Sequence, residues 1–208
     1  SLRAVFSGGP LVLLASAVVF GVVDVLVKLL GPVFTPWDIG VFRFGLGILA
    51  LLTVLRPPGP TPFRGHGRGL LILRGVAGSL SFVAIVTAIG IAPFSTVFVI
   101  FYAFPAFSAL LAPVLFRERI ALAEIPWILL ALAGVAVFFD LRLGEGGLLG
   151  QALSLAGAVS AGIATSSVRK LRERNGAVVI YLYFCVTGAL ISIPGFIVLG
   201  AILVSELH

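Results

Sequence analysis

The sequence predicts an all-α polytopic membrane protein with about seven transmembrane helices. Of its 208 residues, 60% are hydrophobic and only 11% are charged, whereas ordinary soluble domains carry about 25% charged residues. The apolar residues also gather in long runs that are almost free of charge. Each run is about as long as a helix must be to cross the hydrocarbon core, at about 1.5 Å of rise per residue.

These runs predict helices, because a transmembrane β-barrel would show shorter segments of alternating hydrophobicity, of about ten residues each. The first run exceeds the hydrophobic region of a signal peptide, so we interpret it as a retained helix. Short connections separate the runs. The seven predicted spans cover residues 10–30, 36–55, 70–90, 93–115, 122–140, 147–168 and 177–200.

Spans 10–30 and 36–55 hold the ionisable residues that we place at membrane depth. Asp24 and Lys28 are four residues apart on one helix face, whereas Arg43 has no partner on its own helix. An uncompensated charge at this depth costs about 2.5 to 3.5 kcal/mol, so a partner, water or substrate must compensate it. Asp24 pairs either with Lys28 or with Arg43. The role of these charges is either structural, as an ion pair or as side chains that snorkel to the interface, or functional, in binding substrate or protons.

The fourth span, residues 93–115, follows the apolar third span and is the most aromatic part of the chain. Phe98 and Phe101 belong to a stripe with helical spacing, Tyr102 adjoins it, and Pro105 interrupts the backbone hydrogen-bond ladder. Such a stripe packs against helices or lipid, or it lines a ligand site. The second reading draws on Pro105, because broken helices commonly form the binding sites of transporters.

The last three spans are interpreted from their composition. Trp127, near the start of the fifth span, predicts an interface anchor, as Trp37 does in the second. Small residues from Gly157 to Gly162 allow close helix approach in the sixth span. The seventh span contains no lysine, which excludes a retinal Schiff base. Its Cys185 is the single cysteine of the chain, so neither an intrachain disulfide nor a thiolate metal cluster can form.

The residues that carry enzyme chemistry are missing from the spans. His66 and His208 both lie outside them, which excludes a zinc site and a Ser/His pair at membrane depth. No phosphate-binding loop or dinucleotide fingerprint occurs in the connections. The basic residues lie in short connections, where they set topology and meet anionic lipid rather than nucleic acid. We therefore predict a non-enzyme without a cofactor or metal, in contact with the lipid bilayer.

The distribution of Lys and Arg predicts a cytoplasmic N-terminus. Eleven of the fourteen basic residues fall on the side of the N-terminus, Arg142 falls on the opposite side, and Lys28 and Arg43 lie within spans. Seven spans then place His208 outside. The eleven residues are Arg3, Arg56, Arg64, Arg68, Arg74, Arg117, Arg119, Arg169, Lys170, Arg172 and Arg174.

Spans one and six align with a shift of 141 residues, which pairs Gly21 with Gly162 and Lys28 with Arg169. Such matches arise by chance in a sequence rich in Ala, Gly and Leu, or they mark an internal repeat. The two spans run in opposite directions across the membrane. A genuine repeat would therefore be inverted, which is the arrangement that many alternating-access transporters use.

Four segments, taken together, resemble the EamA-type branch of the drug/metabolite transporter superfamily over nearly the whole chain. The family-like features are the Arg43-Phe44 pair, the Phe101-Tyr102 to Pro105 pattern, and Glu118 leading into an Ala/Gly-rich fifth span. The segments are residues 24–44, 92–120, 121–139 and 146–171.

This resemblance implies two inverted five-helix repeats around a central cavity, and a proton-coupled or facilitative carrier or exporter of small metabolites. Family members usually have ten spans. Residues 1–140 would then form one five-helix repeat, and residues 141–208 the first two helices of the second. The start at Ser1 and the lack of methionine fit a piece of a longer product. We expect a multi-pass protein of the bacterial inner membrane.

The leading prediction is a secondary transporter of a small organic metabolite that works by alternating access through its inverted repeats. The alternative is a non-transporting structural or accessory subunit of a larger membrane complex. Coupling to protons and assembly as a homodimer or within a larger complex stay open. The residues assigned to the substrate pathway are Asp24, Lys28, Arg43, Phe98, Phe101, Tyr102, Pro105, Thr165 and Tyr183.

Overall fold

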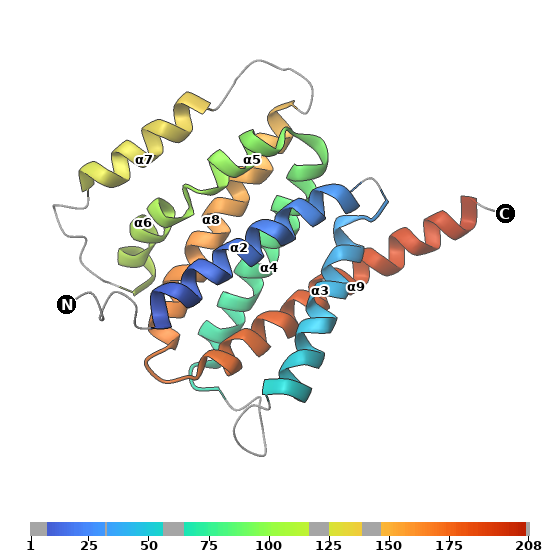
Figure 1. Cartoon of the computed structure of the whole chain (residues 1–208), viewed down its shortest axis with the longest axis horizontal. Coiled ribbons are helices and arrows are strands. Elements are labelled where there is room, and N and C mark those ends of the chain that lie inside the picture. The colour runs from blue at the N-terminus through green and yellow to red at the C-terminus, as the bar shows by residue number, and fades with distance from the viewer. Residues whose placement is uncertain (1–7, 32, 56–64, 117–124, 139–146, 207–208) are drawn as a thin grey trace.

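A computed structural model of the chain describes residues 8–31, 33–55, 65–116, 125–138 and 147–206, and every regular element in these ranges is a helix (Figure 1). The short element η1 is a π-helical turn that continues α3. The elements are α2 (Gly8–Leu30), α3 (Pro36–Ala50), η1 (Leu51–Leu55), α4 (Arg68–Ile91), α5 (Phe94–Phe101), α6 (Phe104–Phe116), α7 (Ile125–Phe138), α8 (Gly147–Leu171) and α9 (Ala177–Glu206).

Within the described ranges, five helical stretches are long and apolar enough to cross a membrane. A shorter apolar helix covers Ile125–Gly134, and α2 has 23 residues. The prediction of a polytopic helical membrane protein is therefore confirmed, while the count of seven spans stays a prediction. The five stretches are Pro36–Thr53, Arg68–Ile91, Phe94–Phe116, Gly147–Leu171 and Ala177–Leu199.

The antiparallel helices α4 and α8 form the centre of the bundle. A Cβ atom at Gly157 would lie 3.0 Å from the Ile85 side chain, and one at Gly150 would clash with Ala92, so α8 presents glycines where α4 comes nearest. The Ser81 hydroxyl donates a 2.8 Å hydrogen bond to the Gly157 carbonyl across the same contact. Lipid gives no hydrophobic drive for helix association, so close backbone approach and such hydrogen bonds hold the pair together.

Small residues also let α3 pack against α9, in antiparallel order. The ring of Phe44, 1% exposed, occupies the space that a side chain at Gly188 would fill. Cys185 sits in the same way against Gly47, where an added Cβ would lie 2.8 Å from its sulfur. Each contact is three or four residues, or about one helical turn, from the next. The four pairs along this seam are Trp37 with Gly195, Gly40 with Ser192, Phe44 with Gly188, and Gly47 with Cys185.

The predicted fourth span is broken into α5 and α6 by a turn at Tyr102–Ala103, and α7 lies at the edge of the bundle beside them (Figure 1). Pro105, the second residue of α6, has no N–H to donate to the Phe101 carbonyl, and its ring would clash with that carbonyl in a continuous helix. The Ala103 amide instead bonds the Ile100 carbonyl at 3.2 Å, as in a 3₁₀ turn. The predicted interruption by Pro105 is confirmed.

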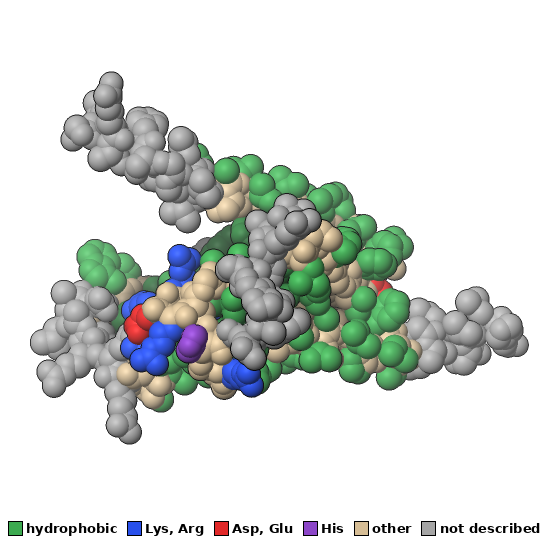
Figure 2. Space-filling view, turned by 90° about the horizontal axis from the view of Figure 1, so that it is seen from below, with side chains coloured by type: hydrophobic (Ala, Val, Ile, Leu, Met, Phe, Trp, Pro, Cys, Tyr) green, Lys and Arg blue, Asp and Glu red, His purple; other side chains and the backbone are tan. Residues whose placement is uncertain are grey.

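The connection before α4 and the connection between α8 and α9 meet at one end of the bundle. The Asn175 side chain accepts a 2.7 Å hydrogen bond from the His66 amide and donates a 3.0 Å bond to the His66 carbonyl. Figure 2 shows Lys and Arg side chains gathered near the histidine on this face. Both connections thus lie on the same side, as the predicted topology requires.

One assignment in the topology count is wrong. Arg74 was counted with the connections, but it lies inside α4, with its side chain half-buried against α9. Six residues separate it from the start of α4, which is about 9 Å along a helix. Ten basic residues remain on the predicted cytoplasmic side against Arg142, so the predicted orientation is unchanged.

We expect cysteine labelling to report this orientation. In a Cys185→Ala background, His66→Cys and Arg172→Cys should stay unlabelled by a membrane-impermeant reagent added outside intact cells, whereas Gly144→Cys should react. The Asn175 bonds use the backbone of residue 66, so His66→Cys leaves them in place. Permeabilised cells serve as the control, in which the first two positions must react. Labelling of positions 66 and 172 from outside would reverse the orientation.

Candidate functional site

A cavity of about 620 Å³ lies between α2 and α3 and reaches Tyr181 of α9. Its walls are almost wholly apolar, and Arg43 is the one charged residue among the eleven described residues that line it. The lining residues are Val19, Phe20, Val23, Leu26, Val27, Leu30, Phe34, Ile39, Phe42, Arg43 and Tyr181.

The start of α3 fixes the position of Arg43. Thr35 and Asp38 form a capping box: the Asp38 carboxylate accepts from the Thr35 amide at 2.7 Å, and Pro36 occupies the first turn. Seven residues after Pro36, Arg43 lies about two turns inside the helix. Its guanidinium sits 4.6 Å from the centroid of the Phe82 ring of α4, within the range of a cation–π interaction.

Three phenylalanine rings connect Arg43 to a second arginine. Phe44 packs edge-on against Phe82 at 5.3 Å and against Phe184 at 5.2 Å between ring centroids. The guanidinium of Arg74 lies 4.6 Å from the Phe184 centroid. The arginines lie over ring faces, which are negative, and the rings meet one another edge to face, so that positive edges contact negative faces. We call Arg43, Phe82, Phe44, Phe184 and Arg74 the Arg–Phe cluster.

The guanidinium of Arg74 has unmet hydrogen-bonding capacity. Its Nε and Nη1 atoms are buried and have no hydrogen-bond partner in the described part of the chain. Gly78, one turn further along α4, leaves room for Nη1, and a Cβ there would clash with it. Buried donors are normally satisfied, so an unsatisfied pair on a charged group calls for an explanation.

Tyr181 and Cys185 lie one turn apart on α9, next to both arginines. Both side chains lie against Gly47 of α3, and the ring of Tyr181 is 5.8 Å from that of Phe184, over which Arg74 lies. Cys185 is fully buried, whereas Tyr181 is 42% exposed and lines the cavity. Tyr181 therefore connects the open cavity to the buried cluster.

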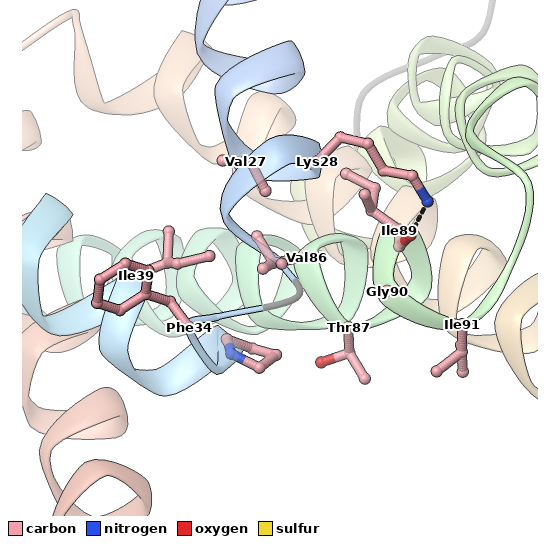
Figure 3. A pocket seen from close by; sticks show the side chains of 11 residues that line it. Val27, Lys28, Phe34, Ile39, Val86, Thr87, Ile89, Gly90 and Ile91 are labelled. Carbon is pink, nitrogen blue, oxygen red and sulfur yellow. Dashed lines mark hydrogen bonds between the residues drawn. The ribbon is translucent and has the colours of Figure 1, made fainter.

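Asp24 and Lys28 of α2 do not form the pair that was one of the predicted alternatives. Lys28 donates a 2.7 Å hydrogen bond to the Ile89 carbonyl of α4, at a second cavity of about 300 Å³ (Figure 3). Asp24 is half-buried and interacts electrostatically with Arg43. Asp24 and Arg43, whose side chains are both described, do not approach within the 4 Å of a salt bridge.

The predicted aromatic residues lie nearer the core than the cavity. Phe98, 9% exposed, packs into a cluster with Val27 of α2, and Phe101 packs partly against the same cluster. Tyr102 is 62% exposed, with its ring 5.8 Å from that of Phe98. Pro105 is exposed beside the helix break. Packing with neighbouring helices therefore accounts for Phe98.

The remaining predicted positions lie apart from Arg43. Thr165 is exposed on α8, and Tyr183 packs against the buried cluster of Leu71, Leu171 and Ile180. Neither lines the 620 Å³ cavity. Glu118 lies outside the described residues.

The sequence-based assignment missed Arg74 and Tyr181. Arg74 falls near the start of the predicted span 70–90, and nothing in the sequence separates Tyr181 from Tyr183. In the described part of the chain, no three His, Cys, Asp or Glu side chains come together to hold a metal ion. The cluster is suited to binding by charge, hydrogen bonds and aromatic contact.

We expect Asp24 and Arg43 to be energetically coupled. Unfolding free energies of Asp24→Asn, Arg43→Gln and the double variant should be non-additive by about 0.5 kcal/mol, the lower end for interacting residues, because the two groups lack a direct salt bridge. The matched control is the cycle of Asp24→Asn with Lys28→Gln, which should be additive because Lys28 bonds a backbone carbonyl. Strict additivity in both cycles would show that Asp24 and Arg43 do not interact.

Known proteins match the chain in two ways. The pattern of the EamA-like transporter family matches residues 7–139, which is more than half of the chain. An "Uncharacterized transporter" from Helicobacter pylori (strain J99) is 24% identical over 196 residues, which cover 93% of this chain and 65% of that protein. The chain thus spans about two thirds of the length of this curated relative. No solved structure shows a significant match.

Proposed function

Because the chain belongs to the EamA-like transporter family, we propose that it acts in a secondary transporter that moves a small organic metabolite across the membrane by alternating access. The observation that carries this proposal is the 620 Å³ cavity with Arg43 and Tyr181 in an otherwise apolar wall. Ligand sites have volumes of about 300 to 1,000 Å³ and combine apolar walls with a few polar groups that orient the ligand.

Two further features support alternating access. The break between α5 and α6 gives the helix pair a discontinuity of the kind found in transporters. The ammonium of Lys28 also donates a hydrogen bond from α2 to the Ile89 carbonyl in the last turn of α4, next to the smaller cavity. In this proposal the protein lies in the bacterial inner membrane with its N-terminus in the cytoplasm. It has two inverted repeats, of which residues 1–140 form the first and residues 141–208 belong to the second.

Reconstitution tests the proposal. Proteoliposomes containing the full gene product should show saturable counterflow of at least one labelled metabolite, and protein-free liposomes should show none. Repeating the assay with an imposed pH gradient decides whether flux is coupled to protons. If a broad metabolite panel gives no flux and the protein purifies in fixed ratio with other membrane subunits, the accessory-subunit alternative replaces the transporter proposal.

A further inference from the structure

We propose that Arg43, Arg74 and Tyr181 form an anion-binding subsite beside the α2–α3 cavity, and that the transported metabolite carries a carboxylate or a similarly small anionic group. This inference rests on the proposed function and adds the chemical class of its substrate. Three observations lead to it: the balance of charges around the cavity, the unmet donors of Arg74, and the position of Tyr181.

The described groups around the Arg–Phe cluster carry an excess of positive charge. Arg43 and Arg74 face a single carboxylate, that of Asp24, which interacts with Arg43. Two other carboxylates whose side chains the structure describes are occupied elsewhere: Asp38 caps α3, and Glu173 pairs with Lys170 at the exposed end of α8. One further negative charge would balance the cluster, because a lone charge is unfavourable at membrane depth.

The geometry of Arg74 fits an anion in the plane of its guanidinium. Phe184 lies against the guanidinium by cation–π contact, so the ring leaves the N–H edge free to bond. Nε and Nη1 are the buried atoms without an acceptor among the described residues. Because the N–H groups of Nε and Nη1 point in different directions, each would donate a separate charge-assisted hydrogen bond, which is shorter and stronger than a neutral one.

Tyr181 places this unmet charge next to the cavity. Its side chain lines the cavity together with Arg43, and its ring is 5.8 Å from that of Phe184, which holds the guanidinium of Arg74. A ligand with an apolar body in the cavity could thus reach the cluster with one charged end. A cationic ligand would meet two guanidinium groups there, and a neutral ligand would leave the excess charge unbalanced.

The test compares ligands that differ only in charge. The full gene product is placed in nanodiscs of phosphatidylcholine, and its melting temperature is measured with short aliphatic and aryl monocarboxylates and with their matched amides and amines. We expect carboxylates to raise the melting temperature and their amides and amines to leave it unchanged. Arg43→Gln and Arg74→Gln should each weaken carboxylate binding, measured from the concentration dependence of the melting temperature, by about tenfold or more.

Two variants control for charge and for folding. Arg172→Gln removes an exposed arginine at the end of α8 and should bind carboxylates like the wild type. Arg74→Lys keeps the charge but loses the planar guanidinium, so it should bind carboxylates more tightly than Arg74→Gln and less tightly than the wild type. If the arginine variants do not fold, the ligand series on the wild type still decides the question.

The outcomes separate this inference from the proposed function. Amides that stabilise the protein as well as carboxylates do, or carboxylates without any effect, overturn the anion subsite. Stabilisation by phosphatidylglycerol that removes the carboxylate effect assigns the site to a lipid headgroup and also overturns it. Counterflow confined to neutral or cationic metabolites refutes the inference while transport stands. Carboxylate binding without flux of any metabolite supports the subsite and refutes the transport proposal.

Discussion

Replacing Arg43 with alanine is expected to reduce counterflow by about tenfold to a hundredfold, since a charged hydrogen bond is worth about 1.5 to 3 kcal/mol. Arg43 is the one charged residue among those that line the 620 Å³ cavity, so no described neighbour in its wall can replace it. The fold should survive, because the cation–π contact with Phe82 contributes only about 0.5 to 2 kcal/mol.

The measurement is the initial counterflow rate of reconstituted protein, paired with size-exclusion and thermal-unfolding profiles. Arg172→Ala is the matched control, because it deletes an exposed arginine away from the cavity and should transport normally. Arg43→Lys should keep part of the rate, since the charge remains while the planar guanidinium is lost. An unchanged rate in Arg43→Ala would remove Arg43 from the substrate pathway.

Substituting Gly162 by alanine should cause a large loss of stability for a single added methyl group, about 1 to 3 kcal/mol. The new Cβ would lie 2.9 Å from the Ser108 amide nitrogen and 3.0 Å from the Phe107 carbonyl carbon. Backbone atoms cannot rotate aside as a flexible side chain can, so α6 and α8 must separate. That separation would also weaken the 2.9 Å hydrogen bond between Ser108 and Ser166.

Thermal or denaturant unfolding in detergent measures this loss. Gly45→Ala is the matched control, because a Cβ at Gly45 meets nothing within 4 Å and alanine favours a helix over glycine by about 1 kcal/mol. We expect Gly45→Ala to be neutral or stabilising. Equal stability of the Gly162→Ala and Gly45→Ala variants would show that α6 and α8 do not pack as closely as described.

Hydrophobicity and Pro105 were sufficient to predict the helices and the break in the fourth span. Long apolar runs need no tertiary information, because a bilayer imposes their length. Arg43 was also identified, since a charge in the middle of such a run is conspicuous. Arg74 was missed because a basic residue near the start of a span is hard to distinguish from one that reaches the lipid headgroups.

The partners within the Arg–Phe cluster could not be predicted from the sequence. In a soluble helix, polar and apolar faces reveal which side turns inward, but a membrane helix is apolar all round. Phe82, Phe184 and Tyr181 therefore look like the other aromatic residues of their spans. The contacts within the cluster depend on Gly78 and Gly188, because these glycines set how closely α4 and α9 approach their neighbours.

The turn at Tyr102–Ala103 also has a mechanical consequence, because it leaves α5 and α6 as two separate helices with a joint between them. The 13 residues of α6 extend for about 20 Å, so a tilt of only about 10° at the joint would displace the far end by about 3 Å. Since Pro105 has already removed a ladder bond there, such a tilt breaks none at that residue. A small rotation near Phe101 would thus become a larger displacement at Phe116, the far end of α6.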